Sequence, residues 1–162
     1  MSDNADPSDI RRATARGSLR SRALRMLARR EHSREELRRK LGGADSDAIE
    51  LEALIDEFEQ RGWLSEQRLT DQAVTRAQGR HGSRRVLDNL RQKGVTGEPL
   101  ARAADGLKAQ ELESARVVWR KRFGRLPADL AEKAKQARFL AGRGFSPEAI
   151  QQVLNAQFDE AD

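Results

Sequence analysis

The chain has 162 residues and a net charge of +5, and its composition of 37% hydrophobic and 35% charged residues favours thin helical cores over one thick core. The absence of cysteine excludes disulfides and thiolate metal sites, and no apolar run approaches the ~20 residues of a membrane span. Because the N-terminus also lacks the features of a signal peptide, we expect a cytoplasmic protein without membrane contacts.

The N-terminal segment differs in composition from the rest of the chain. Residues 1–18 have few large apolar side chains besides Ile10, and we predict a disordered tail there because such a segment gains little from burial. From Leu19 onward, apolar residues recur at helical spacing, and we predict nine helices in three groups of three.

The first three-helix repeat is predicted over residues 19–64. Ser33 and Glu36 have the spacing of a capping box, in which each side chain accepts a hydrogen bond from the other residue's backbone N–H. Ser46 or Asp47 starts the third helix of this repeat, because both residue types cap helices through a side-chain oxygen.

The second repeat is predicted over residues 65–107. Ser65, Ser83 and Thr96 stand at the starts of its three helices, where a hydroxyl group accepts a hydrogen bond from the backbone. Gly94 ends the middle helix in a left-handed turn, which glycine adopts without steric cost.

The third repeat is predicted over residues 108–158. Trp119 faces the core from its first helix, Leu130 lies on the inward face of the second helix, and Ser146 caps the third. Tandem helical units are indicated by a series that occurs twice, Leu90-x3-Gly94-Val95-Thr96-x3-Leu100 and Leu140-x3-Gly144-Phe145-Ser146-x3-Ile150.

No group of residues indicates an enzyme. The two histidines, His32 and His81, lie at predicted helix starts or turns, and no spacing of His, Asp and Glu suits a metal ion. For His81, contact with a phosphate is an alternative to a role in the turn. No glycine-rich nucleotide motif is present, and the serines at helix starts are explained as caps, so we expect no catalytic residue, metal or cofactor.

Positive charge is concentrated in the middle of the chain. Residues 67–143 contain 18 Lys and Arg against 8 Asp and Glu, whereas residues 1–66 contain 13 against 14 and residues 144–162 contain none against 4. Clustered cations attract DNA or an acidic protein surface, although a solvated helix surface explains any single arginine. The candidate binding residues form two clusters, Arg76, Arg80, Arg84, Arg85, Arg91 and Lys93, and Arg116, Arg120, Lys121 and Arg122.

An acidic run over residues 45–59 contains seven Asp and Glu and no basic residue. Two interpretations are open for it, a solvated helix face and a negative surface that meets a basic protein. We favour the solvated face, because charged runs on helices usually face water.

Four segments in this order resemble the RecX family. They cover about residues 19–155 and are Ala23-Leu24-x2-Leu27-Ala28-x4-Ser33-x2-Glu36-Leu37-x3-Leu41, Gly62-Trp63-Leu64, Gly82-x3-Val86-x3-Leu90-x3-Gly94-Val95 and Phe139-Leu140-x3-Gly144-Phe145-Ser146-x3-Ile150. The chain departs from the family pattern after Leu64, where the family usually has an aspartate and an aromatic residue. That departure bears on the packing of the fourth helix.

The resemblance implies an all-α protein of three tandem three-helix repeats in an elongated, curved arrangement. RecX-like proteins are regulators rather than enzymes; they lie in the groove of the RecA–DNA filament, limit its extension and reduce ATP hydrolysis and strand exchange. The resemblance therefore places the chain in DNA repair, recombination and the SOS response, as a monomer whose partners are the RecA filament and single- or double-stranded DNA. It supplies no binding residues, so the candidates above rest on charge alone.

Two other functions stay open. A helical nucleic-acid-binding protein acting without RecA would use its three-helix units as helix-turn-helix modules, although no predicted helix has the base-reading side chains of a recognition helix. The other alternative is a structural interaction scaffold with no regulatory role.

Overall fold

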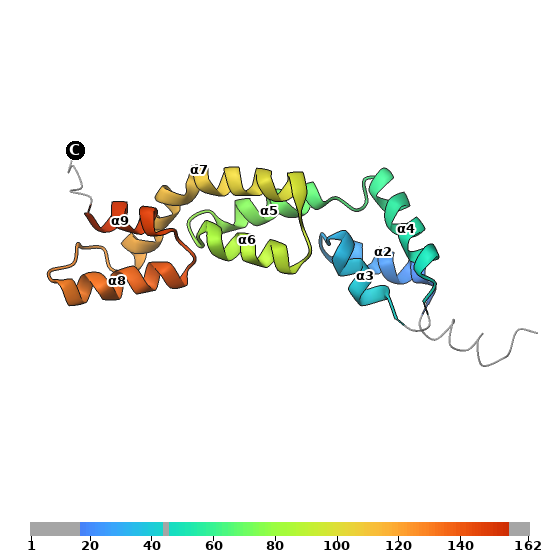
Figure 1. The fold of residues 1–162 in the computed structure, drawn as a ribbon, viewed down its shortest axis with the longest axis horizontal. Helices are drawn as coiled ribbons and strands as arrows, with labels where there is room; N and C mark the ends of the chain where they lie inside the picture. Colours follow the sequence, from blue (N-terminus) through green and yellow to red (C-terminus); the bar gives the residue numbers. More distant parts are fainter. Residues whose placement is uncertain (1–16, 44–45, 156–162) are drawn as a thin grey trace, which may run out of the picture. The chain divides into compact units, whose positions relative to one another are not determined.

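The computed structural model describes residues 17–43 and 46–155, and every regular element in these ranges is an α-helix (Figure 1). The chain divides between Leu69 and Thr70 into two compact units, here called the first and the second unit. The described helices are α2 (Leu19–Arg29), α3 (Arg34–Leu41), α4 (Ala48–Gln60), α5 (Glu66–Ala77), α6 (Ser83–Gln92), α7 (Gly97–Arg122), α8 (Leu130–Gly142) and α9 (Pro147–Asn155).

Parts of three predictions lie outside the described residues. These parts are residues 1–16 of the predicted tail, Asp45 of the acidic run and residues 156–158 of the third repeat. Within the described ranges, no helix combines the length and the hydropathy that crossing a membrane requires.

Helices α2, α3 and α4 pack together in the first unit. The Ser33 hydroxyl accepts a hydrogen bond from the Glu36 N–H at 3.0 Å, and the Glu36 carboxylate accepts one from the Ser33 N–H at 3.2 Å. The predicted capping box is therefore confirmed, and Asp47 caps α4 by accepting from the Ile49 N–H at 2.9 Å. The buried core of this unit consists of Ala23, Leu37, Leu41, Leu51, Ile55, Phe58 and Leu64.

The described residues form eight helices where nine were predicted, because the expected sixth and seventh helices are one continuous helix, α7. The prediction of two helices was wrong for a local reason. Between Leu107 and Leu112 the residues are Lys, Ala, Gln and Glu, which all favour a helix, with no glycine or proline to end it. Buried side chains also continue along one face of α7, from Ala103 and Leu107 to Ala115.

Two of the predicted helix caps differ in the structure. Gly82 is the N-cap of α6, and Ser83 is the first residue of that helix. Thr96 stands at the N-cap of α7 but makes no capping hydrogen bond through its side chain. The predicted caps at Ser65 and Ser146 are confirmed, since each hydroxyl accepts from the backbone N–H three residues later, at 3.1 and 3.2 Å.

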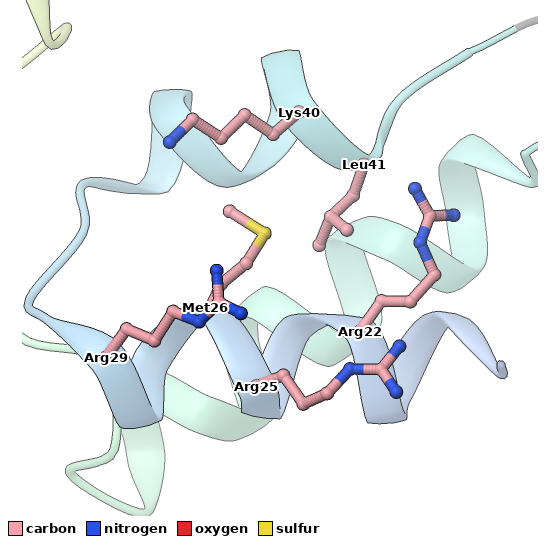
Figure 2. A pocket seen from close by; sticks show the side chains of 6 residues that line it. All are labelled: Arg22, Arg25, Met26, Arg29, Lys40 and Leu41. Atoms are coloured by element: carbon pink, nitrogen blue, oxygen red, sulfur yellow. The ribbon is translucent and has the colours of Figure 1, made fainter. Parts of the chain in front are cut away.

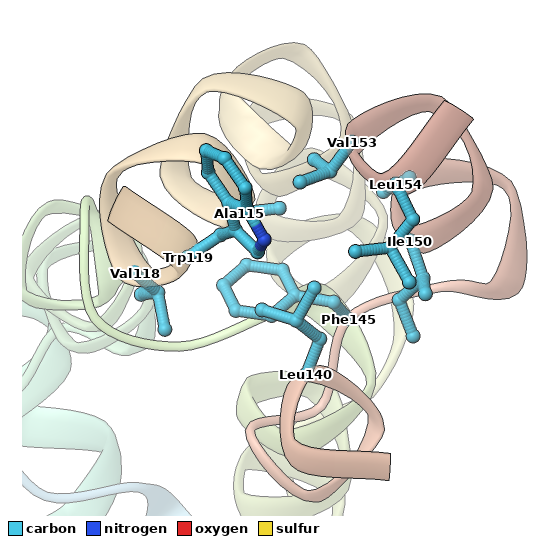
Figure 3. Close-up of a cluster of buried hydrophobic side chains, with 9 residues drawn as sticks. Ala115, Val118, Trp119, Leu140, Phe145, Ile150, Val153 and Leu154 are labelled. Carbon is cyan, nitrogen blue, oxygen red and sulfur yellow. The ribbon is translucent and has the colours of Figure 1, made fainter. Parts of the chain in front are cut away.

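The C-terminal half of α7 packs with α8 and α9 around a second core, shown in Figure 3. Trp119 is 3% exposed, as predicted, and its Nε1–H donates a hydrogen bond to Gln136 Oε1 at 2.8 Å. The predicted inward face of α8 was wrong at Leu130, which is 85% exposed; α8 buries Leu140 and the hydrogen-bonded Gln136 instead. An apolar pattern misses a buried amide, because hydrogen bonds rather than hydropathy fit it to the core.

Candidate anion-binding groove

An open groove with a volume of about 820 Å³ lies along α5, α6 and the C-terminal end of α8, and all its lining residues belong to the second unit. Among the described residues that line it, Asp88 is the only one with a carboxylate. Five cationic side chains share the lining, namely Arg76, Arg80, Arg84, Arg85 and Lys93. We call this feature the α5–α6 groove.

The turn between α5 and α6 brings these cations together. Because α5 ends at Ala77 and α6 begins at Ser83, Arg80 lies in the turn and Arg84 in the first turn of α6. The His81 N–H donates to the Ala77 carbonyl at 2.9 Å and closes the turn. The N-terminal end of a helix carries partial positive charge, which repels the cations near the start of α6. A bound anion would offset both charges.

A second turn, between α8 and α9, is joined to the first by backbone hydrogen bonds. The Gly82 N–H donates to the Arg143 carbonyl at 2.8 Å, and the Arg84 N–H donates to the Gly144 carbonyl at 3.1 Å. A Cβ atom on Gly82 would lie 2.3 Å from the carbonyl carbon and oxygen of Gly144, and one on Gly144 would lie 2.4 Å from the Cβ of Arg85. Both glycines are therefore needed for this approach of one turn to the other.

A carboxylate of α7 holds the starts of α6 and α9. Glu111 Oε1 accepts hydrogen bonds from the Ser83 N–H at 3.2 Å, the Ser83 hydroxyl at 2.9 Å and the Ser146 N–H at 3.1 Å. An anionic group is favourable at the N-terminus of a helix, and the Glu111 carboxylate lies at the N-termini of both α6 and α9. This contact explains why Ser83 does not cap α6, and it fixes the groove wall to the shared helix α7.

His81 lies half-buried in the groove lining, among cations. Burial lowers the pKa of its imidazole below the ordinary value of 6.5, and the positive charges of Arg85, Arg143 and Arg80 lower that pKa further. The imidazole is therefore neutral at pH 7 in the free protein, and an anion in the groove favours its protonation.

The structure places five of the six residues of the first predicted cluster along the groove. Arg91 is the exception: it is not among the lining residues, and its Nη1 lies 3.2 Å from Asp88 Oδ1. Arg91 was predicted with this cluster because its spacing from Arg84 puts both on one face of α6. Helical spacing does not show how far along that face the groove extends.

The residues of the second predicted cluster all lie outside the groove. Arg116 and Arg120 are 3.6 and 3.9 Å from carboxylate oxygens of Glu113. The Arg122 guanidinium lies over the rings of two phenylalanines, 5.4 and 5.6 Å from their centroids, and Lys121 is exposed. The structure thus gives these four cations different neighbours and places none of them in the groove.

The acidic face of α4 is paired with arginines of its own unit. The ion pairs across its surface are Arg20–Glu57, Arg34–Asp56, Arg34–Glu59 and Arg38–Glu52. They come from α2 and α3, so the negative charge of α4 is largely compensated within the first unit. The pairing agrees with the interpretation of this run as a solvated face.

A second cationic pocket, in the first unit, was missed by the sequence analysis. It has a volume of about 180 Å³, lies between α2 and α3, and is lined by Arg22, Arg25, Met26, Arg29, Lys40 and Leu41 (Figure 2). The sequence feature that indicates this pocket is the spacing of Arg22, Arg25 and Arg29, which puts all three on one face of a helix. The near-neutral charge of residues 1–66 concealed it, because acidic residues elsewhere in that segment offset the total.

Comparison with known proteins gives consistent matches. Two family models fit the chain, the first three-helix domain of RecX at residues 20–56 and the third three-helix domain of RecX at residues 109–154. The regulatory protein RecX of Leptothrix cholodnii is 46% identical over 145 residues, which is 90% of this chain and 92% of the relative. The regulatory protein RecX of Ralstonia nicotianae is 42% identical over 148 residues, 90% of this chain and 93% of the relative.

Solved structures match as well. The crystal structure of RecX from Lactobacillus salivarius superposes with a TM-score of 0.70 at 17% sequence identity, over 84% of this chain and 92% of that chain. A second crystal structure, of a regulatory protein RecX, also gives a TM-score of 0.70, at 19% identity over 96% of this chain and 83% of that chain. At these identities the likeness is one of fold.

Proposed function

Because the chain belongs to the RecX family of regulatory proteins, we propose that it binds the filament that RecA forms on DNA and restrains it. Restraint of this kind lowers ATP hydrolysis by RecA, limits filament extension and reduces strand exchange. The observation that carries the proposal is the 46% identity to a regulatory protein RecX over 90% of the chain.

The α5–α6 groove supports a contact with an anionic part of such a filament. Its lining holds five cations against the single carboxylate of Asp88. One guanidinium group can donate hydrogen bonds to two oxygens of the same phosphate or carboxylate. The groove therefore suits DNA phosphates as well as acidic side chains of RecA.

The walls of the groove are already ordered in the free protein. Glu111 ties α6 and α9 to α7, and the Gly82–Gly144 approach joins the two turns. A surface that is already ordered loses less conformational entropy on binding, which increases the affinity for a given set of contacts.

A second candidate function is nucleic-acid binding without RecA. The cations of the α5–α6 groove favour it too, since DNA presents phosphates whether or not RecA covers it. This candidate predicts DNA binding with no effect on the reactions of RecA.

ATP hydrolysis by RecA on single-stranded DNA, measured over a titration of this protein, tests the proposal. We expect inhibition at amounts well below one molecule per RecA protomer, together with slower strand exchange. No effect over a wide titration of folded protein would contradict the proposal. Binding to DNA without inhibition would support the second candidate.

The part played by the groove is tested with Arg80→Gln/Arg84→Gln. We expect weaker inhibition of RecA, because the variant removes two positive charges from the groove. The melting temperature should change little, because both side chains are exposed. The matched control Arg102→Gln/Lys108→Gln removes the same charge from exposed positions of α7 outside the groove. An equal loss in both variants would mean that net charge, rather than the groove, governs the contact.

A further inference from the structure

Two groups stand out among the described cations of the first unit. One group, which includes Arg20, Arg34 and Arg38, contacts carboxylates of α4. The other group consists of the four cations of the pocket between α2 and α3, Arg22, Arg25, Arg29 and Lys40. Among residues 17–43 and 46–155, no carboxylate lies within ion-pairing distance of these four. Positive charge is therefore uncompensated on this side of the described unit.

The pocket combines these cations with a fixed apolar floor (Figure 2). Three arginines come from one face of α2, and Lys40 comes from α3. Met26 and Leu41 point into the space between the two helices, and both pack in the core of the unit. Their positions are therefore set by folding, and the four cations line the same pocket around them.

A row of cations of this kind fits a ligand whose charge repeats. Arg29 follows Arg22 by seven positions on α2, or about 10 Å along the helix axis at ~1.5 Å per residue, and Arg25 lies between them. A nucleic-acid strand presents phosphates in succession, and guanidinium groups bind phosphate oxygens in pairs. The half-buried side chain of Met26 lies beside these cations and offers an apolar contact for a base or sugar of such a strand.

We propose that the α2–α3 pocket is a second anion-binding site, which takes the phosphate backbone of single-stranded nucleic acid. The pocket belongs to the first unit and the α5–α6 groove to the second, so each can be altered without the other. The proposal does not rest on inhibition of RecA, because it concerns contact with the nucleic acid itself.

Binding of fluorescein-labelled oligothymidylate to the full chain, followed by fluorescence anisotropy at several salt concentrations, tests the site. For single strands, log K falls with log salt by about 0.7 per neutralised phosphate. We expect Arg22→Gln/Arg29→Gln to make this slope shallower by about 1.4, the value for two phosphate contacts. Glutamine preserves the helix propensity of α2, so the variant is expected to fold.

The matched control is Arg39→Gln/Arg61→Gln. Both arginines lie in the first unit outside the pocket, with side chains 57% and 53% exposed. Each pairs with a glutamate one turn earlier on its helix, Arg39 with Glu35 at 3.3 Å and Arg61 with Glu57 at 2.9 Å. The control removes the same charge as the pocket variant, and its slope should equal that of the unaltered protein.

Two results would overturn the inference. One is a slope that the pocket variant leaves unchanged or that the control lowers equally. The other is unchanged binding to oligothymidylate with weaker binding to poly-L-glutamate, which would assign the pocket to an acidic protein. If Arg22→Gln/Arg29→Gln lowers the melting temperature, Arg25→Gln/Lys40→Gln repeats the test from the other two cations. Inhibition of RecA by the unaltered protein is measured separately, so the two proposals fail independently.

Discussion

Single residues decide whether the two turns beside the α5–α6 groove fit together. A Cβ atom at Gly82 would lie 2.3 Å from backbone atoms of Gly144 and Phe145. We expect Gly82→Ala to lower the free energy of unfolding by about 1–3 kcal/mol, because the backbone must move to make room. Gly142→Ala is the control, since apart from its chain neighbours and the backbone of its own helix no atom lies within 4 Å of its Cβ position. Equal effects of the two changes in urea denaturation would contradict the close approach of the turns.

The same turn contains a residue that links binding to pH. Burial and the charges of Arg85, Arg143 and Arg80 hold the pKa of His81 below 6.5 in the free protein. Phosphates in the groove oppose these charges and raise that pKa, so binding takes up a proton. The affinity for nucleic acid should therefore rise as the pH falls through the pKa of His81 in the complex, and level off below its pKa in the free protein.

Nuclear magnetic resonance tests this linkage directly, because His32 and His81 are the only histidines in the sequence. Titration of the imidazole protons with and without oligothymidylate should show a higher pKa for His81 in the complex. Burial lowers the pKa of His32, and Lys40 of the α2–α3 pocket is among the charges that lower it further, so His32 reports on that pocket and not on the groove. Oligothymidylate that binds without raising the pKa of His81 would show that it does not occupy the groove.

Residue patterns predicted contacts correctly where both partners lie close together in the sequence. The capping box of Ser33 and Glu36 spans three residues, and its spacing alone identifies it. Ser83 was predicted as a cap, but its hydroxyl bonds Glu111, which lies 28 residues further along the chain. No local pattern contains a partner at that distance, and the same reason kept Gln136 out of the predicted core.

At the scale of helices, apolar spacing predicted the class and position of the elements but missed the continuity of α7. Most predicted helix starts follow a cap or turn residue, and the stretch from Leu107 to Leu112 has none. One long helix serves two groups instead, because its buried face continues from Ala103 to Trp119.

The continuity of α7 predicts the effect of changes at Ala109, an exposed residue in the middle of the helix. Ala109→Gly should lower the free energy of unfolding by about 1 kcal/mol, and Ala109→Pro by about 3 kcal/mol or more. Ala128→Gly, at an exposed position between α7 and α8, should have little effect. If Ala109→Gly proved as neutral as Ala128→Gly in urea denaturation, the helix would have to be interrupted there.

For the whole molecule, the distribution of charge along the sequence predicted one cationic surface and concealed another. The excess of positive charge over residues 67–143 corresponds to the α5–α6 groove, which contains five of the six cations of the first cluster. Residues 1–66 are nearly neutral in sum, yet the four cations of the α2–α3 pocket have no carboxylate among the residues that line it. The total charge of a segment does not show such a cluster, whereas the spacing of Arg22, Arg25 and Arg29 does.

The pairing of α4 predicts that its acidic face stabilises the first unit and does not contact RecA. The Arg34 guanidinium binds Asp56 at 2.7 Å and also contacts Glu59, and its side chain is 27% exposed. Asp56→Asn/Glu59→Gln removes both carboxylates, and exposed ion pairs contribute about 0.2–1 kcal/mol each, so the melting temperature should fall slightly. Inhibition of RecA should persist in this variant and weaken in Arg80→Gln/Arg84→Gln. The reverse result, inhibition lost on neutralising α4 and kept on neutralising the groove, would assign the contact with RecA to α4.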